Sequence, residues 1–325
     1  MISVLSAHHL TISILLAFLL DALFGDPHVL FHPVRLMGQE ITFLERHLRK
    51  PTDSAHAQRA KGALLVMLVL LTTAGISAIL LIIAQKIHII ALVCTESVLC
   101  YYCLAARSLC DESMKVYHAL ARKNLAESRA AVSMIVGRDT DILDEQGIAK
   151  AAVETIAENA NDGVIAPLFF MVLGGPVLAL VYKAINTMDS MIGYKDETYA
   201  HFGFCAAKTD DIAGFIPARL SALCMIAASA LCGYNTKNAI KIFARDRYKH
   251  ASPNSAQTES VCAGALCLKL AGDTVYNGVV EKKEFIGDYH RAIEAKDIVR
   301  ANKLMYVSAI FALFAGLALR LVYFL

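Results

Sequence analysis

The sequence predicts an all-α protein, a polytopic helical bundle with about four to six membrane segments. Of its 325 residues, 57% are hydrophobic and only 18% are charged, whereas soluble domains carry about 25% charged residues. The mean hydropathy is +0.51. The apolar residues also gather into runs of roughly 20 residues, which is the length of helix that crosses a bilayer.

The apolar runs give the membrane segments. Four are predicted to span the membrane: Leu10–Phe24, Gly62–Ala84, Ile87–Leu109 and Leu304–Leu325. Two are interrupted and are predicted either to span or to form re-entrant hairpins: Val164–Ile185 and Ile212–Cys232. The first run has no basic start and no small-residue cleavage site, so it is interpreted as a membrane helix rather than a signal peptide.

The two interrupted runs carry residues that are unusual at membrane depth. Gly174-Gly175-Pro176 lies in the middle of one run, and Pro217 with Arg219 lies in the other. Broken helices and charges are tolerated there mainly where they line a wet or protein-enclosed cavity. Both runs are therefore candidates to border a polar site.

An amphipathic segment fills residues 24–61 between the first two runs. Within Pro33–Lys50, the apolar residues Val34, Met37 and Ile41 recur at helical spacing, and Pro33 opens the helix at its first turn. Two placements are open for this helix: in the headgroup plane, or packed on other helices.

Two long polar loops cover residues 110–163 and 233–303, and both are predicted to be helical in large part. Their Lys and Arg content, with that of residues 24–61, places them in the cytoplasm by the positive-inside rule. No internal repeat is found, so residues 1–325 are predicted to form a single membrane domain with cytoplasmic elaborations. No basic stripe interleaves with aromatic residues, so nucleic acid is not an expected partner.

The stretch ETIAENAND holds a first candidate site. Glu154, Glu158 and Asp162 are four residues apart, so one continuous helix would place all three on one face. Asn159 and Asn161 flank that face. Carboxylates in such a group suit Mg²⁺, which takes one or two of them together with substrate phosphates. The alternative is a solvated acidic face at a helix end.

A second candidate site follows in Tyr182–Gly203. Asn186 and Asp189 are one helical turn apart, with Lys183 and Lys195 nearby and Arg219 further along. Cations for phosphate and acids for a metal are what a nucleoside triphosphate site needs. No Walker A or GxGxxG motif is present to identify such a site. Anchoring at the membrane edge is the alternative for the two lysines.

Several motifs together resemble one family. They are, in order, Gly25-Asp26-Pro27 with His32-Pro33-Val34, Gly137-Arg138-Asp139, Val153–Pro167, Tyr182–Lys195, Pro217-Ala218-Arg219 and Ser252-Pro253-Asn254. The chain from about Leu20 to about Tyr276 resembles the adenosylcobinamide-phosphate synthase (CobD/CbiB) family, and Asn186–Lys195 is the most specific match. It departs at Ser255-Ala256, where the family usually has Ala-Gly.

The resemblance implies a membrane enzyme of late cobalamin biosynthesis. It would use ATP and Mg²⁺ to join adenosylcobyric acid, a corrinoid, to (R)-1-amino-2-propanol phosphate or aminopropanol through an amide bond. The expected location is the inner (cytoplasmic) cell membrane, with the active site on the cytoplasmic side. Small-molecule substrates, the lipid bilayer, other late cobalamin-assembly enzymes and further copies of the chain are the expected partners.

The roles of individual residues are our inference from that chemistry. The predicted catalytic residues are Glu154, Glu158, Asp189 and Lys195. The residues predicted to bind substrate or ATP are Arg138, Asn159, Lys183, Asn186, Arg219, Ser252 and Asn254. The predicted metal ligands are Asp139, Glu158, Asp162 and Asp189. We expect half-buried segments that bring Asp189 and Lys195 toward Glu158.

Two other classes remain open from the sequence. One is a non-catalytic membrane signalling or scaffold protein of related fold, like AmpE. The other is a transporter, since broken helices with charges at the membrane midplane also occur in carriers. The absence of an inverted repeat and the concentration of charge in loops favour the enzyme over the transporter.

Overall fold

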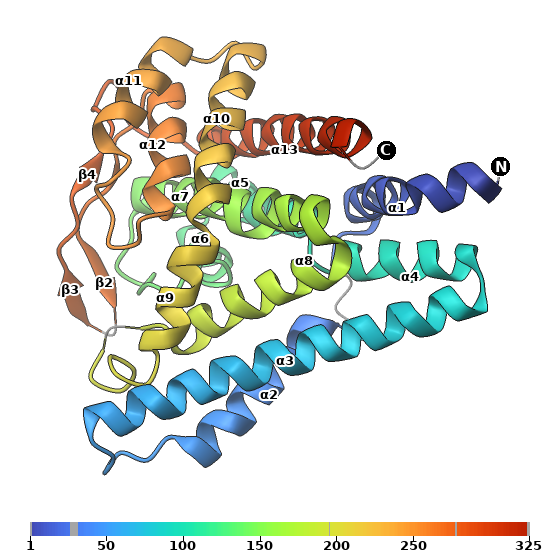
Figure 1. Ribbon diagram of the computed structural model, residues 1–325. Helices are drawn as coiled ribbons and strands as arrows, with labels where there is room; N and C mark the ends of the chain where they lie inside the picture. The colour runs from blue at the N-terminus through green and yellow to red at the C-terminus, as the bar shows by residue number, and fades with distance from the viewer. Residues whose placement is uncertain (1, 27–31, 195, 277, 324–325) are drawn as a thin grey trace. The chain divides into compact units, whose positions relative to one another are not determined.

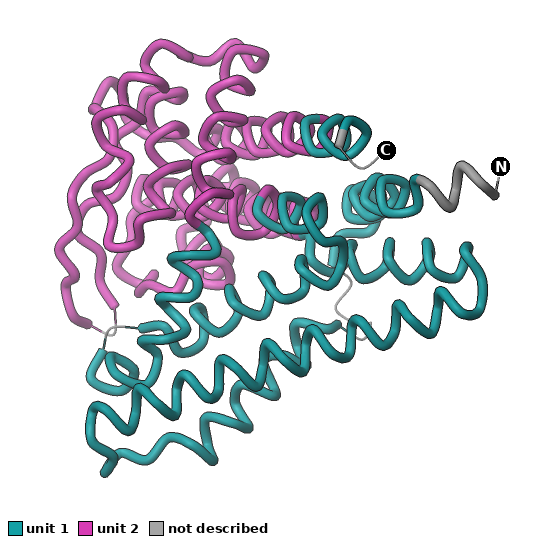
Figure 2. The backbone as a smooth tube through the Cα atoms, in the orientation of Figure 1, with its two compact units in different colours: residues 1–104, 166–214, 315–325 teal, residues 105–165, 215–314 magenta. Residues whose placement is uncertain are grey.

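Helices account for nearly all the regular structure in the computed structural model, which describes residues 2–26, 32–194, 196–276 and 278–323 (Figure 1). The all-α prediction is confirmed. The backbone forms two compact units (Figure 2). Unit 1 comprises Met1–Leu104, Ala166–Gly214 and Ala315–Leu325, and unit 2 comprises Ala105–Ile165 and Phe215–Phe314. The single domain over residues 1–325 stays a prediction.

Four helical runs among the described residues are long and apolar enough to cross a membrane: Ala55–Ile87, Ile89–Ala121, Glu145–Ile192 and Lys296–Val322. A broken pair, Phe204–Ala213 with Phe215–Leu231, would make a fifth. These runs indicate a multi-pass membrane protein, as the sequence predicts. The first predicted span, Leu10–Phe24, is not among these runs, because the regular helix His8–Phe24 is apolar but short. Its length is about 26 Å, whereas the hydrocarbon core of a bilayer is about 30 Å thick.

Unit 1 is entirely helical in its described regular structure. Its helices are α1 (Ile2–Phe24), α2 (Pro33–Leu48), α3 (Ala55–Ile87), α4 (Ile89–Tyr101), α8 (Ala166–Ile192), α9 (Phe204–Ala213) and the end of α13 (Lys296–Tyr323). His88 separates α3 from α4 and accepts a hydrogen bond from the Ile90 amide at 3.2 Å, so it caps the second helix. The predicted span Ile87–Leu109 lies largely within the apolar run Ile89–Ala121, which a short break at residues 102–105 divides into α4 and α5 (Ala106–Ala121).

Both interruptions read from the sequence are present. Inside α8, Gly174 and Gly175 have non-helical backbone angles, and Gly175 has a φ of +63° that glycine adopts without strain. The other run breaks at Gly214, between α9 and α10 (Phe215–Leu231). Pro217 lies in the first turn of α10, where a missing amide hydrogen costs nothing, so the glycine rather than the proline marks the break.

Helix α2 packs on α3, which is one of the two placements open from the sequence; the headgroup-plane placement stays a prediction. Met37 and Ile41 are buried. The Thr72 hydroxyl of α3 donates to Glu40 at 2.7 Å. His32 caps the helix by accepting from the Val34 amide at 3.2 Å, with proline at the first helical position.

Unit 2 is helical with a small β-rich edge. It contains α5 (Ala106–Ala121), α6 (Leu125–Ser133), α7 (Glu145–Ala160), the π-helix η1 (Asn161–Ile165), α10, α11 (Thr236–Asp246), α12 (Ser255–Leu266) and most of α13. All twelve residues of α12 are buried. Gly264 allows this helix to approach α11 closely, since a Cβ there would lie 2.6 Å from the Ala239 Cα.

Four short strands in unit 2 were not predicted from the sequence. They are β1 (Leu270–Ala271), β2 (Thr274–Tyr276), β3 (Val279–Glu281) and β4 (Phe285–Ile286). Strands β1 and β4 pair antiparallel, as do β2 and β3. Valine and threonine favour strands, and Gly278, with a φ of +76°, lies where β2 turns into β3.

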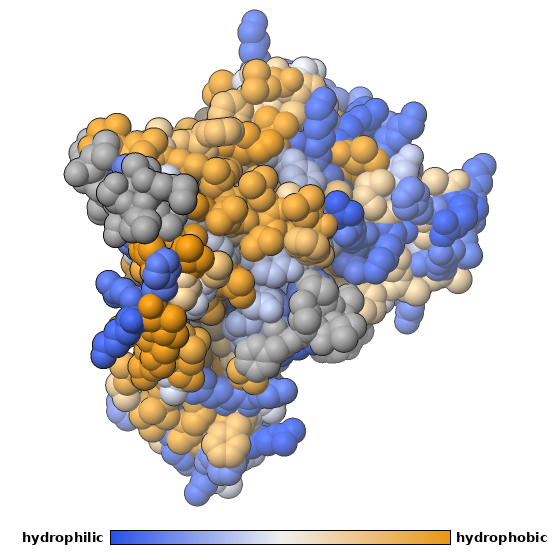
Figure 3. Space-filling model, turned by 90° about the vertical axis from the view of Figure 1, so that its right-hand side faces the viewer, coloured by the Kyte–Doolittle hydropathy of each residue, from blue (hydrophilic) through white to orange (hydrophobic). Residues whose placement is uncertain are grey.

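Many large apolar side chains are exposed. Along α3, Leu71, Ile76 and Ile79 are 57–62% exposed, and hydrophobic residues cover much of the face seen in Figure 3. Monomeric soluble proteins rarely expose contiguous apolar surface on this scale. Lipid contact explains why these side chains point outward.

Candidate functional site

A buried ion pair lies at the centre of a polar cluster in unit 2. Arg138 Nη2 is 2.8 Å from Glu154 Oε2, and the two side chains are 17% and 6% exposed. The other oxygen of Glu154 accepts from the Ala271 amide at 2.6 Å. Burial disfavours the charged form of Arg138, but its attraction to the Glu154 carboxylate outweighs this cost. The pKa of Arg138 is therefore raised. A buried pair is stable only when its remaining polar atoms are satisfied, as here.

Glu158 lies one helical turn further along α7. Its Oε1 accepts a hydrogen bond from the Ser255 hydroxyl at 2.9 Å, at the start of α12. Burial lowers the pKa of His250, and the negative charge of Glu158 partly offsets that shift. Unlike Glu154, Glu158 is only partly buried, so a ligand could reach it.

Glu259 is a member of this cluster that the sequence did not assign to the site. It lies one turn after Ser255 on α12 and is 5% exposed. Burial raises its pKa well above the ordinary value, and the charges of Glu158 and Glu154 raise it further, against the opposing effect of Arg138 and Lys283. The sequence did carry a signal for its burial, because Glu259 lies in a helix made mostly of small residues, SAQTESVCAGAL.

The predicted Ser252-Pro253-Asn254 and Arg219 also meet within unit 2. Arg219 Nη1 is 3.5 Å from Asn254 Oδ1 and donates to the Phe215 carbonyl at 2.6 Å. The guanidinium also stacks on the Phe215 ring, 3.4 Å from its centroid. The Ser252 hydroxyl accepts from the Asn254 amide at 3.2 Å.

The expected single helix face through Asp162 is wrong in one respect. The α-helix ends at Ala160, and Asn161–Ile165 is a π-helix. A π-turn holds more residues than an α-turn, so spacing by four no longer aligns Asp162 with Glu154 and Glu158. Asp162 instead accepts from the Asn161 side chain at 2.6 Å, and Asn161 accepts from Ser221 at 2.8 Å.

Two other predicted residues hydrogen-bond to the backbone. Asp139 Oδ2 accepts from the Gly278 amide at 2.7 Å, and the Asp139 amide donates to the Val275 carbonyl at 2.9 Å, which fastens the β2–β3 hairpin. Asn159 donates to the Thr155 carbonyl of its own helix at 3.1 Å. Ligand binding by either side chain stays a prediction.

A second polar cluster lies in unit 1. Lys183, Asn186 and Asp189 lie on α8, while Lys195 lies outside the described residues. His32 Nε2 is 3.6 Å from Asp26 Oδ1. Burial lowers the pKa of His32; Asp26 opposes this, and the positive charges of Arg35 and Lys183 lower it further. A carboxylate and several cations therefore influence one another here.

The predicted site residues thus divide between the units. Unit 2 brings together Arg138, Glu154, Glu158, Arg219, Ser252 and Asn254, and unit 1 holds Lys183, Asn186 and Asp189. Their convergence on one site stays a prediction. In the part of the chain that the structure describes, no three His, Cys, Asp or Glu residues are grouped to hold a metal ion.

The fold and these clusters define a multi-pass helical membrane protein with buried acid–base side chains. The chain belongs to the CobD/CbiB protein family, whose model matches residues 14–305.

Relatives are similar over nearly their whole length. The cobalamin biosynthesis protein CobD of Pelobacter propionicus is 43% identical over 295 residues, covering 91% of this chain and 90% of the relative. The CobD of Clostridium perfringens is 40% identical, covering 95% and 98%. The cobalamin biosynthesis protein CbiB of Salmonella typhimurium is 43% identical, covering 94% and 96%. No solved structure matches the chain.

Proposed function

We propose that the protein is an amide-forming ligase of cobalamin biosynthesis that uses ATP and Mg²⁺. Its substrates are adenosylcobyric acid and (R)-1-amino-2-propanol phosphate or aminopropanol. Family membership and the names of the relatives support the role in cobalamin biosynthesis. The observation that carries the ligation step is the unit 2 cluster, where a partly exposed carboxylate, Glu158, adjoins the buried Arg138–Glu154 pair.

The reaction has two steps. A carboxylate oxygen of adenosylcobyric acid attacks the γ-phosphorus of ATP, and ADP leaves. The acyl carbon then carries a phosphate leaving group. The amine nitrogen then attacks that carbon, phosphate leaves, and the nitrogen loses a proton. The protein must therefore neutralise phosphate charge and accept a proton near the amine.

Glu158 is suited to the amine. It is the acid of the cluster that combines partial exposure with a fixed orientation, since Ser255 donates to one of its oxygens. The other oxygen remains able to accept from an ammonium group and to take its proton. Glu154 serves a positioning role, because both of its oxygens are occupied by Arg138 and the Ala271 amide.

The residues present fit Mg²⁺ as a shared ion. Mg²⁺ commonly takes one or two carboxylates, several waters and substrate phosphates rather than a protein-only cage. Glu158 is a partly exposed carboxylate of unit 2 and would hold it. When bound, the ion supplies positive charge to the phosphate groups. Arg219, held on Phe215 beside Asn254, adds a fixed cation for the phosphate or carboxylate.

The test uses purified protein in detergent with Mg-ATP, adenosylcobyric acid and each of the two amines. Mass spectrometry is expected to show the amide, and E158Q is expected to lose at least about 100-fold in turnover, the usual scale for a lost general base. E112Q is the matched control, because Glu112 pairs with a surface lysine, Lys115. Absence of product with both amines from wild-type protein would overturn the proposal.

The same preparation separates the two alternatives. A ligase consumes ATP only when the acid and an amine are both present. A transporter moves substrate into proteoliposomes without making amide, and a scaffold does neither.

A further inference from the structure

The break in α8 deprives one backbone carbonyl of its usual donor. In a continuous α-helix the carbonyl of Val172 would accept from the amide four residues further on, but that residue is Pro176, which has no amide hydrogen. Gly174 and Gly175, between them, have non-helical backbone angles. Water is scarce inside a membrane, so a donor for this carbonyl has to come from elsewhere in the protein.

Arg320 of α13 supplies such a donor. Its Nη1 donates to the Val172 carbonyl at 2.6 Å. Gly316 lies one turn earlier on α13, and a Cβ there would lie only 2.6 Å from the Val172 Cγ2 atom. The end of α13 that belongs to unit 1 therefore touches α8 at its break.

The charge of Arg320 lies among apolar side chains. Its neighbours Leu319, Leu321 and Val322 are 43–72% exposed, as expected for side chains that face lipid. Charged groups at such depth pair with one another or with backbone carbonyls. Arg320 has both kinds of partner, since the carboxylate of Glu96 also acts on it electrostatically.

Glu96 of α4 is in turn held by α1. It is 4% exposed. His9 Nδ1 lies 3.0 and 2.9 Å from its two carboxylate oxygens, and the Ser13 hydroxyl donates to Oε2 at 2.9 Å. Helix α1 also contacts the break itself, because a Cβ added at Gly175 would lie 3.2 Å from Leu10 Cδ1. Polar and apolar contacts of α1, α4 and α13 thus converge on the break in α8.

The break divides α8 into two segments. The first follows the π-helix η1 in the chain, and the second carries three predicted site residues, Lys183, Asn186 and Asp189. A rotation at the break would move these three side chains together relative to the first segment. A small change in backbone angles at the break would therefore have a large effect on the predicted site.

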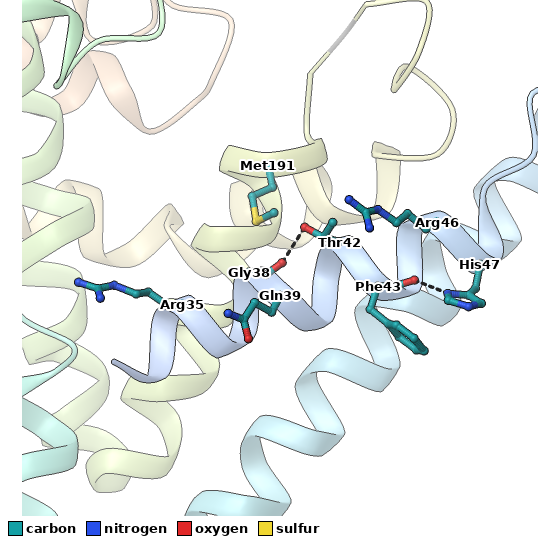
Figure 4. A pocket seen from close by; sticks show the side chains of 8 residues that line it. All are labelled: Arg35, Gly38, Gln39, Thr42, Phe43, Arg46, His47 and Met191. Atoms are coloured by element: carbon teal, nitrogen blue, oxygen red, sulfur yellow. Dashed lines mark hydrogen bonds between the residues drawn. The ribbon is translucent and has the colours of Figure 1, made fainter. Parts of the chain in front are cut away.

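The far end of the second segment has space beside it. Met191 in its last turn lies against α2, where a Cβ added at Gly38 would be 3.6 Å from the Met191 sulfur. An open cavity of about 550 Å³, lined by α2 and Met191, adjoins this contact (Figure 4). This end of α8 can therefore move toward the cavity without first displacing packed side chains.

We propose that the Gly174–Pro176 break is a hinge in α8 and that Arg320 is its latch. While Arg320 donates to Val172, the carbonyl keeps a donor and the two segments keep one angle. When the guanidinium withdraws, the carbonyl needs another donor and the hinge changes its angle, which the two glycines permit. Glu96 stabilises the latched state, because it neutralises Arg320 beside the break.

Spin labels on the two segments test the hinge in full-length protein in nanodiscs. They are placed at Phe169 and Ser190, which are at least partly exposed, on unnatural amino acids because the chain has nine cysteines. Wild type is expected to give one narrow distance distribution by double electron–electron resonance, and R320Q a broader or shifted one. R320K, which can still donate to the carbonyl, is expected to keep the wild-type distribution. No turnover is measured, so the result is independent of the proposed ligase reaction.

Hydrogen exchange measures the size of the effect. Amides of residues 171–180 in R320Q are expected to exchange at least about tenfold faster than in wild type, the scale of one lost charge-assisted hydrogen bond. E96Q removes the neutralising charge but keeps the size of the side chain, and is expected to act in the same direction by less. K86Q is the matched control, because Lys86 is an exposed cation in the last turn of α3, and should match wild type in both measurements.

Each outcome decides the proposal. A changed distance distribution with faster exchange confined to α8 in R320Q supports the hinge. An unchanged distribution in R320Q overturns it, as does faster exchange spread equally over α3 and α4, since Arg320 would then be a general packing contact of unit 1. If R320Q does not fold, E96Q carries the same comparison, and wild-type behaviour of E96Q in both measurements overturns the proposal.

Discussion

The Arg138–Glu154 cluster of unit 2 and helix α2 of unit 1 hold their charges in opposite ways. In unit 2, Arg138 and Glu154 are buried and paired at 2.8 Å, and Glu259 beside them is 5% exposed. On α2 of unit 1, by contrast, Arg35 and Arg46 are exposed. Buried, matched charges fix a geometry before any ligand arrives, whereas exposed charges add little to stability.

The largest expected effect comes from breaking the buried pair. R138M leaves Glu154 buried without its cation, so unfolding free energy should fall by about 3–5 kcal/mol. The measurement is chemical or thermal unfolding in detergent. The control is R107M, because Arg107 pairs with Asp111 on the surface, with side chains 45% and 52% exposed, and should show no measurable change. Equal effects of the two variants would contradict the contrast between buried and exposed charge.

A packing contact in unit 1 should rank next. Gly62 of α3 lies so close to the chain that a Cβ would be 1.9 Å from the Phe202 carbonyl oxygen. G62A must displace backbone, at a cost of about 1–3 kcal/mol. On the same helix, nothing lies within 4 Å of a Cβ added at Gly75, so G75A should be neutral or stabilise by up to about 1 kcal/mol. A neutral G62A would show that unit 1 tolerates a different helix spacing.

The pH dependence of stability should reveal Glu259. Burial and neighbouring acids raise its folded pKa above the ordinary value of 4.5, so between these two values the folded state binds more protons than the unfolded state. Its contribution is therefore complete below about pH 4.5 and is lost as the pH rises through the folded pKa. E259Q, which resembles the protonated acid, should flatten this decline in unfolding profiles. An unchanged slope would mean that Glu259 is ionised in the folded protein.

The smallest effect is expected at an exposed arginine of α2. Arg46 is exposed, and within the described ranges it forms no ion pair. R46Q should change stability by no more than about 0.5 kcal/mol, as surface substitutions usually do. The same unfolding assay measures it. A destabilisation comparable to that of R138M would show that the cations of α2 hold unit 1 together.

The sequence predicted local features well. The apolar runs, the breaks at Gly174-Gly175 and the amphipathic α2 were all visible because each depends on neighbours a few residues apart. The short strands β1–β4 were missed, since two or three residues are too few to show a period. The π-helix was missed as well, and with it the position of Asp162, because one extra residue in a turn leaves no mark in the spacing of side chains.

The sequence by itself determined that this is a helical membrane protein of the CobD/CbiB type, since hydropathy and motifs are properties of the chain. Only the tertiary structure decided that Glu259 of α12 joins Glu154 and Glu158 of α7, and that Arg138 pairs with Glu154. It also decided that α2 packs on α3. The physical reason is that burial and electrostatic partners depend on residues distant in the chain, which no local pattern specifies.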